Sequence, residues 1–163
     1  MRTGAVLIRK WRQASRQPLS VISLIPAAWM LIGTASFAVA VLPFRRIAPV
    51  LGRNLGTASL TPLASPEAMR RAIHIGQAIS LAAKYMPARS DCLPQAMAAA
   101  ILCRALRVPY AAYFGASVSA AGREGELAAH AWVQSGQVTV SGGMGSFQQY
   151  GVVACFVPPD YKV

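Results

Sequence analysis

The sequence predicts an α+β fold in which helices come first and antiparallel strands second. Apolar residues recur at helical spacing through 66–86 and again from Cys92 to just before Pro109, whereas apolar and polar residues alternate as in strands from Tyr110 onward. This segregation is typical of α+β domains. The chain has 163 residues, of which 55% are hydrophobic and 13% charged, so we expect one sizeable core rather than a disordered chain.

The two central helices carry clear start signals. Ser65 is the expected N-cap of the first, with Pro66 at the first helical position and Glu67 in the first turn. The second starts near Cys92, because Pro94 is tolerated only in a first turn and an alanine-rich run follows. We expect the first helix to end at Pro87 and to present one apolar face made of Met69, Ile73, Gly76, Ile79, Ala83 and Met86.

Four strands are expected after the helices. They cover 110–118, 127–134, 137–142 and 150–157. A polar loop at 121–126 separates the first two, and a turn at Ser135 and Gly136 joins the next pair. The stretch 52–66 is rich in Gly, Ser, Thr and Pro and reads as a linker or extended arm. This gives an apolar and basic helical segment at 1–56, a linker at 57–66 and an α+β core at 67–163.

An uncharged run at 17–44 is long enough to cross a bilayer as a helix. Pro26 and Gly33 dilute it, and basic residues flank it on both sides without a decisive asymmetry. A spanning helix is therefore an alternative, and a cleaved signal peptide is disfavoured because the run is too long. We expect one or two apolar helices, broken at Pro26, that pack on the core or make a peripheral contact with a membrane or partner through residues 18–44.

Charge and cysteine usage narrow the class of protein. Sixteen basic against five acidic residues give a net charge of +11, which favours acidic lipid surfaces or acidic peptides as partners. Nucleic acid is not an expected partner, because no basic recognition helix or aromatic-and-basic motif is present. Three cysteines without a CxxC pair predict neither a disulfide framework nor a metal site, and a cytoplasmic location fits them.

Cys92 and His130 are the candidate catalytic pair. A cysteine at a helix start faces unpaired backbone N–H groups that favour the thiolate, whereas Cys103 and Cys155 lie within apolar runs and are expected in the core. His130 follows on a strand, as thiol-based acyl transfer requires of its base. Trp132 should share its strand face, where it either lines the substrate groove or packs in the core. The other histidine, His74, is expected to be a helix-surface or packing residue.

The stretches SDCLPQAMAAAILCRALRVPYAAYFGASV and LAAHAWVQSGQVTVSGG resemble the transglutaminase-like core of the lasso-peptide leader peptidases, the B proteins. The cysteine-leucine pair at a helix start, Phe114 with Gly115 on a strand, and His-Ala-Trp-Val on the next strand carry the resemblance. LPFRR at 42–46 resembles the leading segment of that family.

The resemblance implies a transglutaminase/papain-like cysteine peptidase without a cofactor. Its substrate would be a ribosomally made lasso-peptide precursor, from which it removes the leader. Its partners would be a separate leader-recognition protein and an asparagine-synthetase-like cyclase. The location implied is the cytoplasm, with association at the inner face of the membrane as an alternative.

One feature of the family is missing. The family places an aspartate about twelve positions after the histidine, where this chain has Ser141, Gly142 and Gly143. A backbone carbonyl, Ser141 or the more distant Asp160 could orient the imidazole instead. A weak or inactive homologue that serves as a scaffold subunit, a membrane-anchored protein, and an amide cross-linking enzyme that uses the same dyad remain alternatives.

Overall fold

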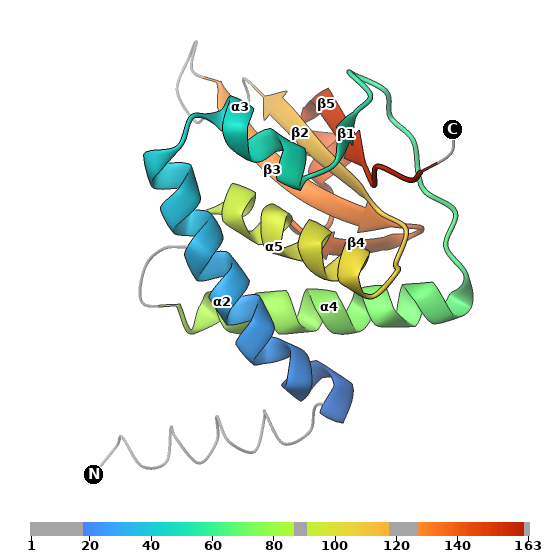
Figure 1. The fold of residues 1–163 in the computed structure, drawn as a ribbon. Coiled ribbons are helices and arrows are strands. Elements are labelled where there is room, and N and C mark those ends of the chain that lie inside the picture. The colour runs from blue at the N-terminus through green and yellow to red at the C-terminus, as the bar shows by residue number, and fades with distance from the viewer. Residues whose placement is uncertain (1–17, 87–90, 118–126, 162–163) are drawn as a thin grey trace.

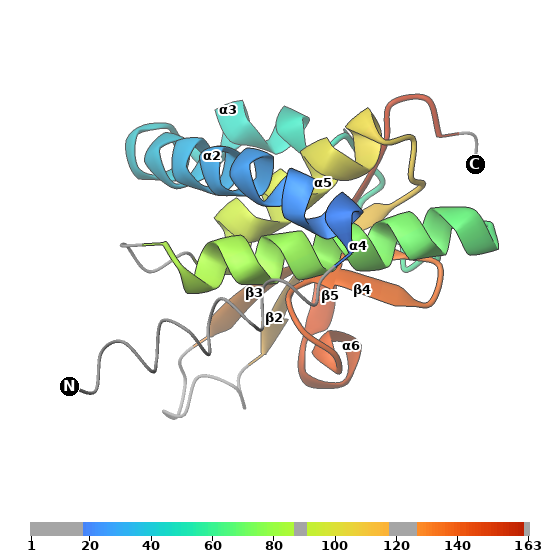
Figure 2. The ribbon, with the colours of Figure 1, turned by 90° about the horizontal axis from the view of Figure 1, so that it is seen from below.

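The computed structural model describes residues 18–86, 91–117 and 127–161, and within them it has the predicted α+β architecture (Figure 1). Helices stack in layers on one face of a single sheet, and the short helix α6 lies on the other side (Figure 2). The helical elements are α2 (Leu19–Val41), α3 (Phe44–Ile47), the 3-10 helix η1 (Ala48–Val50), α4 (Pro66–Lys84), α5 (Cys92–Ala105) and α6 (Ser146–Gln149). The strands are β1 (Arg53–Asn54), β2 (Ala111–Ser117), β3 (Ala128–Ser135), β4 (Val138–Ser141) and β5 (Gly151–Val157).

The sheet has the strand order β1-β5-β2-β3-β4, and every pairing is antiparallel. The four predicted strands are present, whereas the two-residue strand β1 lies in the stretch predicted as a linker or arm. Hydrogen bonds tie that stretch to the sheet: Leu55 N–H donates to the Cys155 carbonyl, and Gly136 N–H to the Pro62 carbonyl. The predicted loop 121–126 lies outside the described residues.

The two central helices begin as predicted. The Ser65 hydroxyl accepts a hydrogen bond from Ala68 N–H at the start of α4, and α5 begins at Cys92. The apolar face predicted for α4 is wrong in part, because Ile73 is exposed while Ile75 and the alanines on either side of it are buried. Helix α4 packs on α2 and α5 on one side and on β4 on the other. The face that it buries therefore differs from the predicted apolar face. Pro87, the predicted end of this helix, lies outside the described residues, and α4 ends at Lys84.

Helix α2 runs unbroken through Pro26, which corrects the expected break. Proline removes one backbone hydrogen bond from a helix interior. Val21 and Ala28, on either side of it, are fully buried, so packing keeps the two halves of the helix in line. Among the described residues this is the one helix long and apolar enough to span a membrane, by length and composition.

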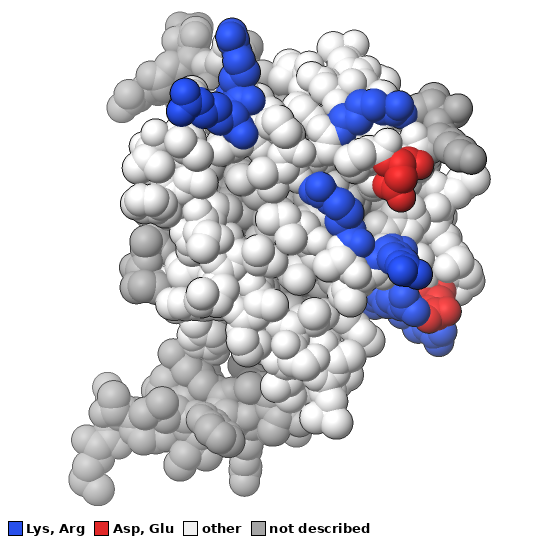
Figure 3. Space-filling model, viewed as in Figure 1, with Lys and Arg blue, Asp and Glu red and all other residues white. Residues whose placement is uncertain are grey.

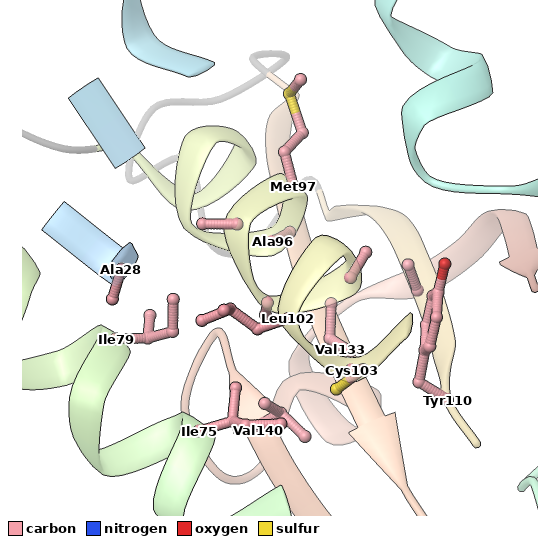
Figure 4. Packing of buried hydrophobic residues seen from close by; sticks show 14 of the residues in the cluster. Ala28, Ile75, Ile79, Ala96, Met97, Leu102, Cys103, Tyr110, Val133 and Val140 are labelled. Atoms are coloured by element: carbon pink, nitrogen blue, oxygen red, sulfur yellow. The ribbon is translucent and has the colours of Figure 1, made fainter. Parts of the chain in front are cut away.

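Two hydrophobic clusters occupy the two faces of the sheet. The larger one joins α2, α4, α5 and the helix-facing side chains of the sheet, and it consists mainly of alanine, valine and isoleucine (Figure 4). Ala131 and Val133 of β3 belong to it. Trp132, between them in sequence, belongs to the second cluster with Tyr113 and Cys155. The alternation predicted for β3 is therefore present, and β3 contributes to both clusters.

Candidate active site

Cys92 is the first residue of α5, at the point where the helix leaves its N-cap residue Asp91. The Asp91 side chain makes no capping hydrogen bond, so it satisfies none of the N–H groups of the first turn, to which Pro94 contributes no N–H. Cys92 is half-buried, whereas Cys103 and Cys155 are fully buried. Burial raises the pKa of Cys103 to about 12 and that of Cys155 to about 11, so both stay thiols at neutral pH.

A cavity of about 690 Å³ brings Cys92 and His130 to one site. Its walls come from α4, the first turn of α5, the edge strand β4 and the glycine turn that follows β4. Polar side chains of Gln77, Ser80 and Gln95 share the lining with apolar ones. Among the described residues no Asp, Glu, Lys or Arg lines it, so His130 carries the one ionisable nitrogen of the cavity.

His130 reaches the cavity at an open part of the sheet edge. Strand β4 ends at Ser141, which pairs with Val133, so β4 does not cover β3 at His130. The ring's Nε2 donates a hydrogen bond to the Gly142 carbonyl over 2.7 Å. This assigns the proton to Nε2 and leaves Nδ1 free to accept one in the neutral ring. No hydrogen bond joins this ring to the Cys92 thiol within the described parts of the chain.

Aromatic rings support the imidazole. His130 stacks on Tyr150, with ring centroids 4.8 Å apart, and on Trp132, at 5.9 Å. Trp132 is only 1% exposed, stacks in turn on Tyr113, and does not line the cavity. Of the two positions expected for Trp132, the structure has the one in the core, where the ring lies beneath the histidine, and not the one in a substrate groove. Stacked rings hold the imidazole plane because any tilt would open voids between them.

Two glycines make this arrangement possible. At Gly142, φ is +93°, and an added Cβ would lie 2.3 Å from the Trp132 Cβ, so only glycine fits the turn that presents its carbonyl to His130. At Gly115 an added Cβ would lie 2.7 Å from the Tyr150 Cβ and 2.8 Å from the Trp132 ring. Gly115 therefore leaves the space into which the Tyr150 side chain and the Trp132 ring pack.

The structure gives the orienting position to a backbone group. Gly142 is twelve residues after His130, at the position where the resemblance leads one to expect an aspartate. Ser141 lines the cavity, but its buried Oγ has no hydrogen-bond partner within the described residues. Asp160 lies elsewhere, in a second cavity beside Arg104 and Arg107. Neither of the two orienters named from the sequence meets the ring, and the carbonyl alternative does.

Two contributors to the site were not predicted: Tyr150 as a stacking partner and Gly115 as the residue that makes room. A backbone carbonyl was among the predicted orienters, but the residue that supplies it, Gly142, was not named. The SGG stretch after the alternating residues 137–141 was a usable signal for a tight turn. Nothing local marks Tyr150, because it meets His130 only through the pairing of β5 with β2. His74 lies apart from the cavity as expected, and its Nδ1 shares a 3.0 Å hydrogen bond with the Ser20 hydroxyl of α2.

A metal site has no support within residues 18–86, 91–117 and 127–161, where no group of three His, Cys, Asp or Glu side chains could hold an ion. The features present are a cysteine at a helix start, packed against an antiparallel sheet, and a strand histidine at the same cavity. These features define the class of papain- and transglutaminase-like folds.

The family model of the transglutaminase-like superfamily, Transglut_core3, matches residues 38–155. Since this is most of the 163 residues, the chain belongs to the transglutaminase-like superfamily. No curated protein and no solved structure matches the chain significantly. The matched range begins within α2 and includes Cys92, His130, Gly142 and Tyr150.

Proposed function

We propose that this protein is a cysteine peptidase that removes the leader from a lasso-peptide precursor. The observation that carries the proposal is that Cys92, at the start of α5, and His130, held by the Gly142 carbonyl, line one cavity. The superfamily fold is compatible with a cysteine peptidase. The choice of a lasso precursor rests on the sequence resemblance to the B proteins.

The chemistry assigns one role to each group. The Cys92 thiolate attacks the scissile carbonyl carbon, and as the C–N bond breaks, His130 gives its proton to the leaving amine. The leader is then held as a thioester on Cys92, and the core peptide departs with a free N-terminus. Water, deprotonated by His130, releases the leader carboxylate and restores the thiolate. The freed N-terminus is the group that a cyclase joins to an acidic side chain.

The Gly142 carbonyl suits this cycle because it fixes the tautomer of His130. With the proton on Nε2, the Nδ1 lone pair is left for the thiol. A neutral carbonyl stabilises the imidazolium less than a carboxylate does, which predicts a slower enzyme than one with an aspartate at this place. Catalytic hydrogen bonds are often long before substrate binds, so the open Cys92–His130 pair is compatible with a site that closes on its peptide.

The test incubates the protein with a lasso-peptide precursor, a leader-recognition protein and a lasso cyclase. Mass spectrometry of the released leader is the readout. Cys92→Ala and His130→Ala should each abolish release, because they remove the nucleophile and its base. Cys103→Ala and His74→Ala are matched controls from the core and from α4, and both should still cleave. Cleavage at the normal rate by Cys92→Ala would overturn the proposal.

A second candidate is a scaffold subunit that has the peptidase fold but not its chemistry. The missing carboxylate and the absence of a Cys92–His130 hydrogen bond among the described residues favour it. In that case the wild-type protein would release no leader, and all four variants would support lasso formation equally well.

Supplying a primary amine in the same reaction tests cross-linking chemistry, since an amide product would form in place of the free leader acid.

A further inference from the structure

Helix α2 carries a continuous apolar stripe on its outward face. Leu19, Met30 and Phe37 are 84%, 61% and 70% exposed, and Ile22 and Val41 are exposed beside them. At 100° per residue all five fall on one side of the helix. With 23 residues and a rise of about 1.5 Å each, the stripe is about 34 Å long. An exposed apolar surface of this length marks an interaction site.

The opposite face of α2 is part of the protein core. Val21, Ala28 and Ile32 are fully buried in the large cluster, against α4 and α5. The Ser20 hydroxyl also shares a hydrogen bond with His74 of α4. A bilayer-spanning α2 would have to withdraw all of these groups from the core. The helix therefore suits a position in the plane of a surface, with one face in the protein and the other outward.

The polar groups near the stripe are already satisfied within the helix. The Ser23 hydroxyl donates to the Ser20 carbonyl over 3.1 Å, and the Thr34 hydroxyl donates to the Met30 carbonyl over 3.0 Å. No charged residue occurs anywhere in α2. The hydroxyls of Ser23 and Thr34 are thus already paired, which lowers the cost of contact with a hydrocarbon layer.

Positive charge adjoins the stripe at one end. Arg45 and Arg46 are exposed in α3, directly after α2, and Phe44 holds α3 to the sheet through an edge contact with Phe114 at 5.2 Å. Basic side chains lie at the α3 end of this face, at the upper left of Figure 3, and others lie at its centre and right, whereas the acidic side chains in this view lie only at the right. The described acidic residues lie on α4, before α5 and after β5, and none lies on α2 or α3.

We propose that α2 and α3 dock this protein on an anionic lipid surface, with α2 in the membrane plane. An apolar face bordered by arginines is the pattern of interfacial helices that combine hydrocarbon contact with attraction to acidic headgroups. No residue of α2 or α3 lines the candidate active site, and α2 packs on the helices rather than on the sheet. Docking therefore leaves the cavity open to a peptide arriving from solution.

The experiment is cosedimentation of the full chain with phosphatidylglycerol vesicles and, separately, with phosphatidylcholine vesicles. We expect binding to phosphatidylglycerol and at least tenfold weaker binding to phosphatidylcholine. Arg45→Gln with Arg46→Gln should weaken phosphatidylglycerol binding about tenfold, because each basic residue near the surface contributes to adsorption. Arg70→Gln with Arg107→Gln removes the same charge elsewhere and should bind nearly as the wild type does.

A second pair of variants tests how much the apolar side chains of α2 contribute to vesicle binding. Leu19→Gln, Met30→Gln and Phe37→Gln together should weaken binding about a hundredfold, because three exposed side chains no longer enter the hydrocarbon. Leu63→Gln, Leu127→Gln and Val153→Gln change three equally exposed positions away from α2 and should have little effect. The melting temperatures of both triple variants should match that of the wild type. Cys92→Ala should bind as the wild type does, since docking does not involve the catalytic thiol.

Four results would overturn the proposal. One is the absence of binding to either vesicle, which would assign the stripe to a protein partner. A second is equal loss of binding in the stripe variant and its control. A third is a dimer in solution that the stripe variant dissociates, because the stripe would then face a second copy of the chain. The fourth is resistance of the cellular protein to carbonate extraction, which would show a spanning helix instead of an in-plane one.

Discussion

The two faces of the sheet hold the two candidate catalytic residues by different means. On the helix side, Cys92 begins a helix whose body is buried among small aliphatic side chains, and its position follows from helix packing. On the other side, His130 rests on Trp132 and Tyr150 and donates to a glycine carbonyl. The nucleophile is thus placed by many interchangeable contacts, and the base by a few specific ones. We call the sheet face that carries Trp132 and Tyr150 the aromatic face. Substitutions there should therefore affect the base more selectively than substitutions around Cys92 affect the nucleophile.

The largest effect is expected at the centre of the aromatic face. Trp132→Ala should lower the free energy of unfolding by about 4 kcal/mol, because a buried ring is lost and a cavity remains. It should also reduce cleavage strongly, since His130 loses a stacking partner. Trp132→Phe keeps an aromatic ring and should lose less of both. Chemical denaturation and leader release measure the two effects, and an active, stable Trp132→Ala variant would show that the stack does not hold the base.

The glycine turn allows a closer comparison. Gly142→Ala meets both a positive φ and the Trp132 Cβ, so it should cost about 3 kcal/mol and displace the carbonyl that holds His130. Gly143→Ala has a similar positive φ of +81° but open space around its Cβ, and should cost about 1 kcal/mol.

If the carbonyl orients the base, kcat should fall in Gly142→Ala, whereas Gly143→Ala should keep a kcat near that of the wild type. Equal kcat values in the two variants would show that the Gly142 carbonyl does not orient His130 for catalysis.

The rates at which the three cysteine thiols are modified in the wild-type protein allow a comparison of the two faces of the sheet. Cys92 opens on the cavity, so iodoacetamide should modify it first in the folded protein. Cys103 and Cys155, one in each hydrophobic cluster, should stay unmodified even at pH 9, because their raised pKa values keep them protonated there. Unfolding in guanidinium should expose all three. Peptide mapping would show the order, and equal labelling of Cys103 in the native protein would contradict it.

The smallest effects are expected at the two residues that the sequence suggested as orienters. Ser141→Ala removes a buried hydroxyl that has no partner in the described residues, so leader release should change less than threefold and stability should not fall. Asp160→Asn should also leave release unchanged, because Asp160 lines a different cavity. A loss of more than tenfold in either variant would mean that the carboxylate or the hydroxyl reaches the histidine during turnover.

Whether a feature of the fold or site could be predicted depends on how far apart in the sequence the interacting residues lie. The helix starts at Ser65 and Cys92 and the alternation around His130 depend on neighbours in the sequence, so they could be predicted. The stacking of Tyr150 and the room left at Gly115 depend on strands brought together from distant parts of the chain. The unbroken course of α2 through Pro26 likewise depends on burial against α4 and α5. A single sequence carries no local signal for any of these.

The strand order has a consequence for biosynthesis. Strand β5 comes last in the chain among the described strands, yet it lies between β1 and β2 inside the sheet. A nascent chain therefore contains Cys92 and His130 before it contains the strand that joins β1 to the sheet and brings Tyr150 to the histidine. Pairings between distant segments form late. The ribosome must finish residues 151–157 before this site can be assembled, so a half-made chain with its nucleophile already exposed would have no completed base.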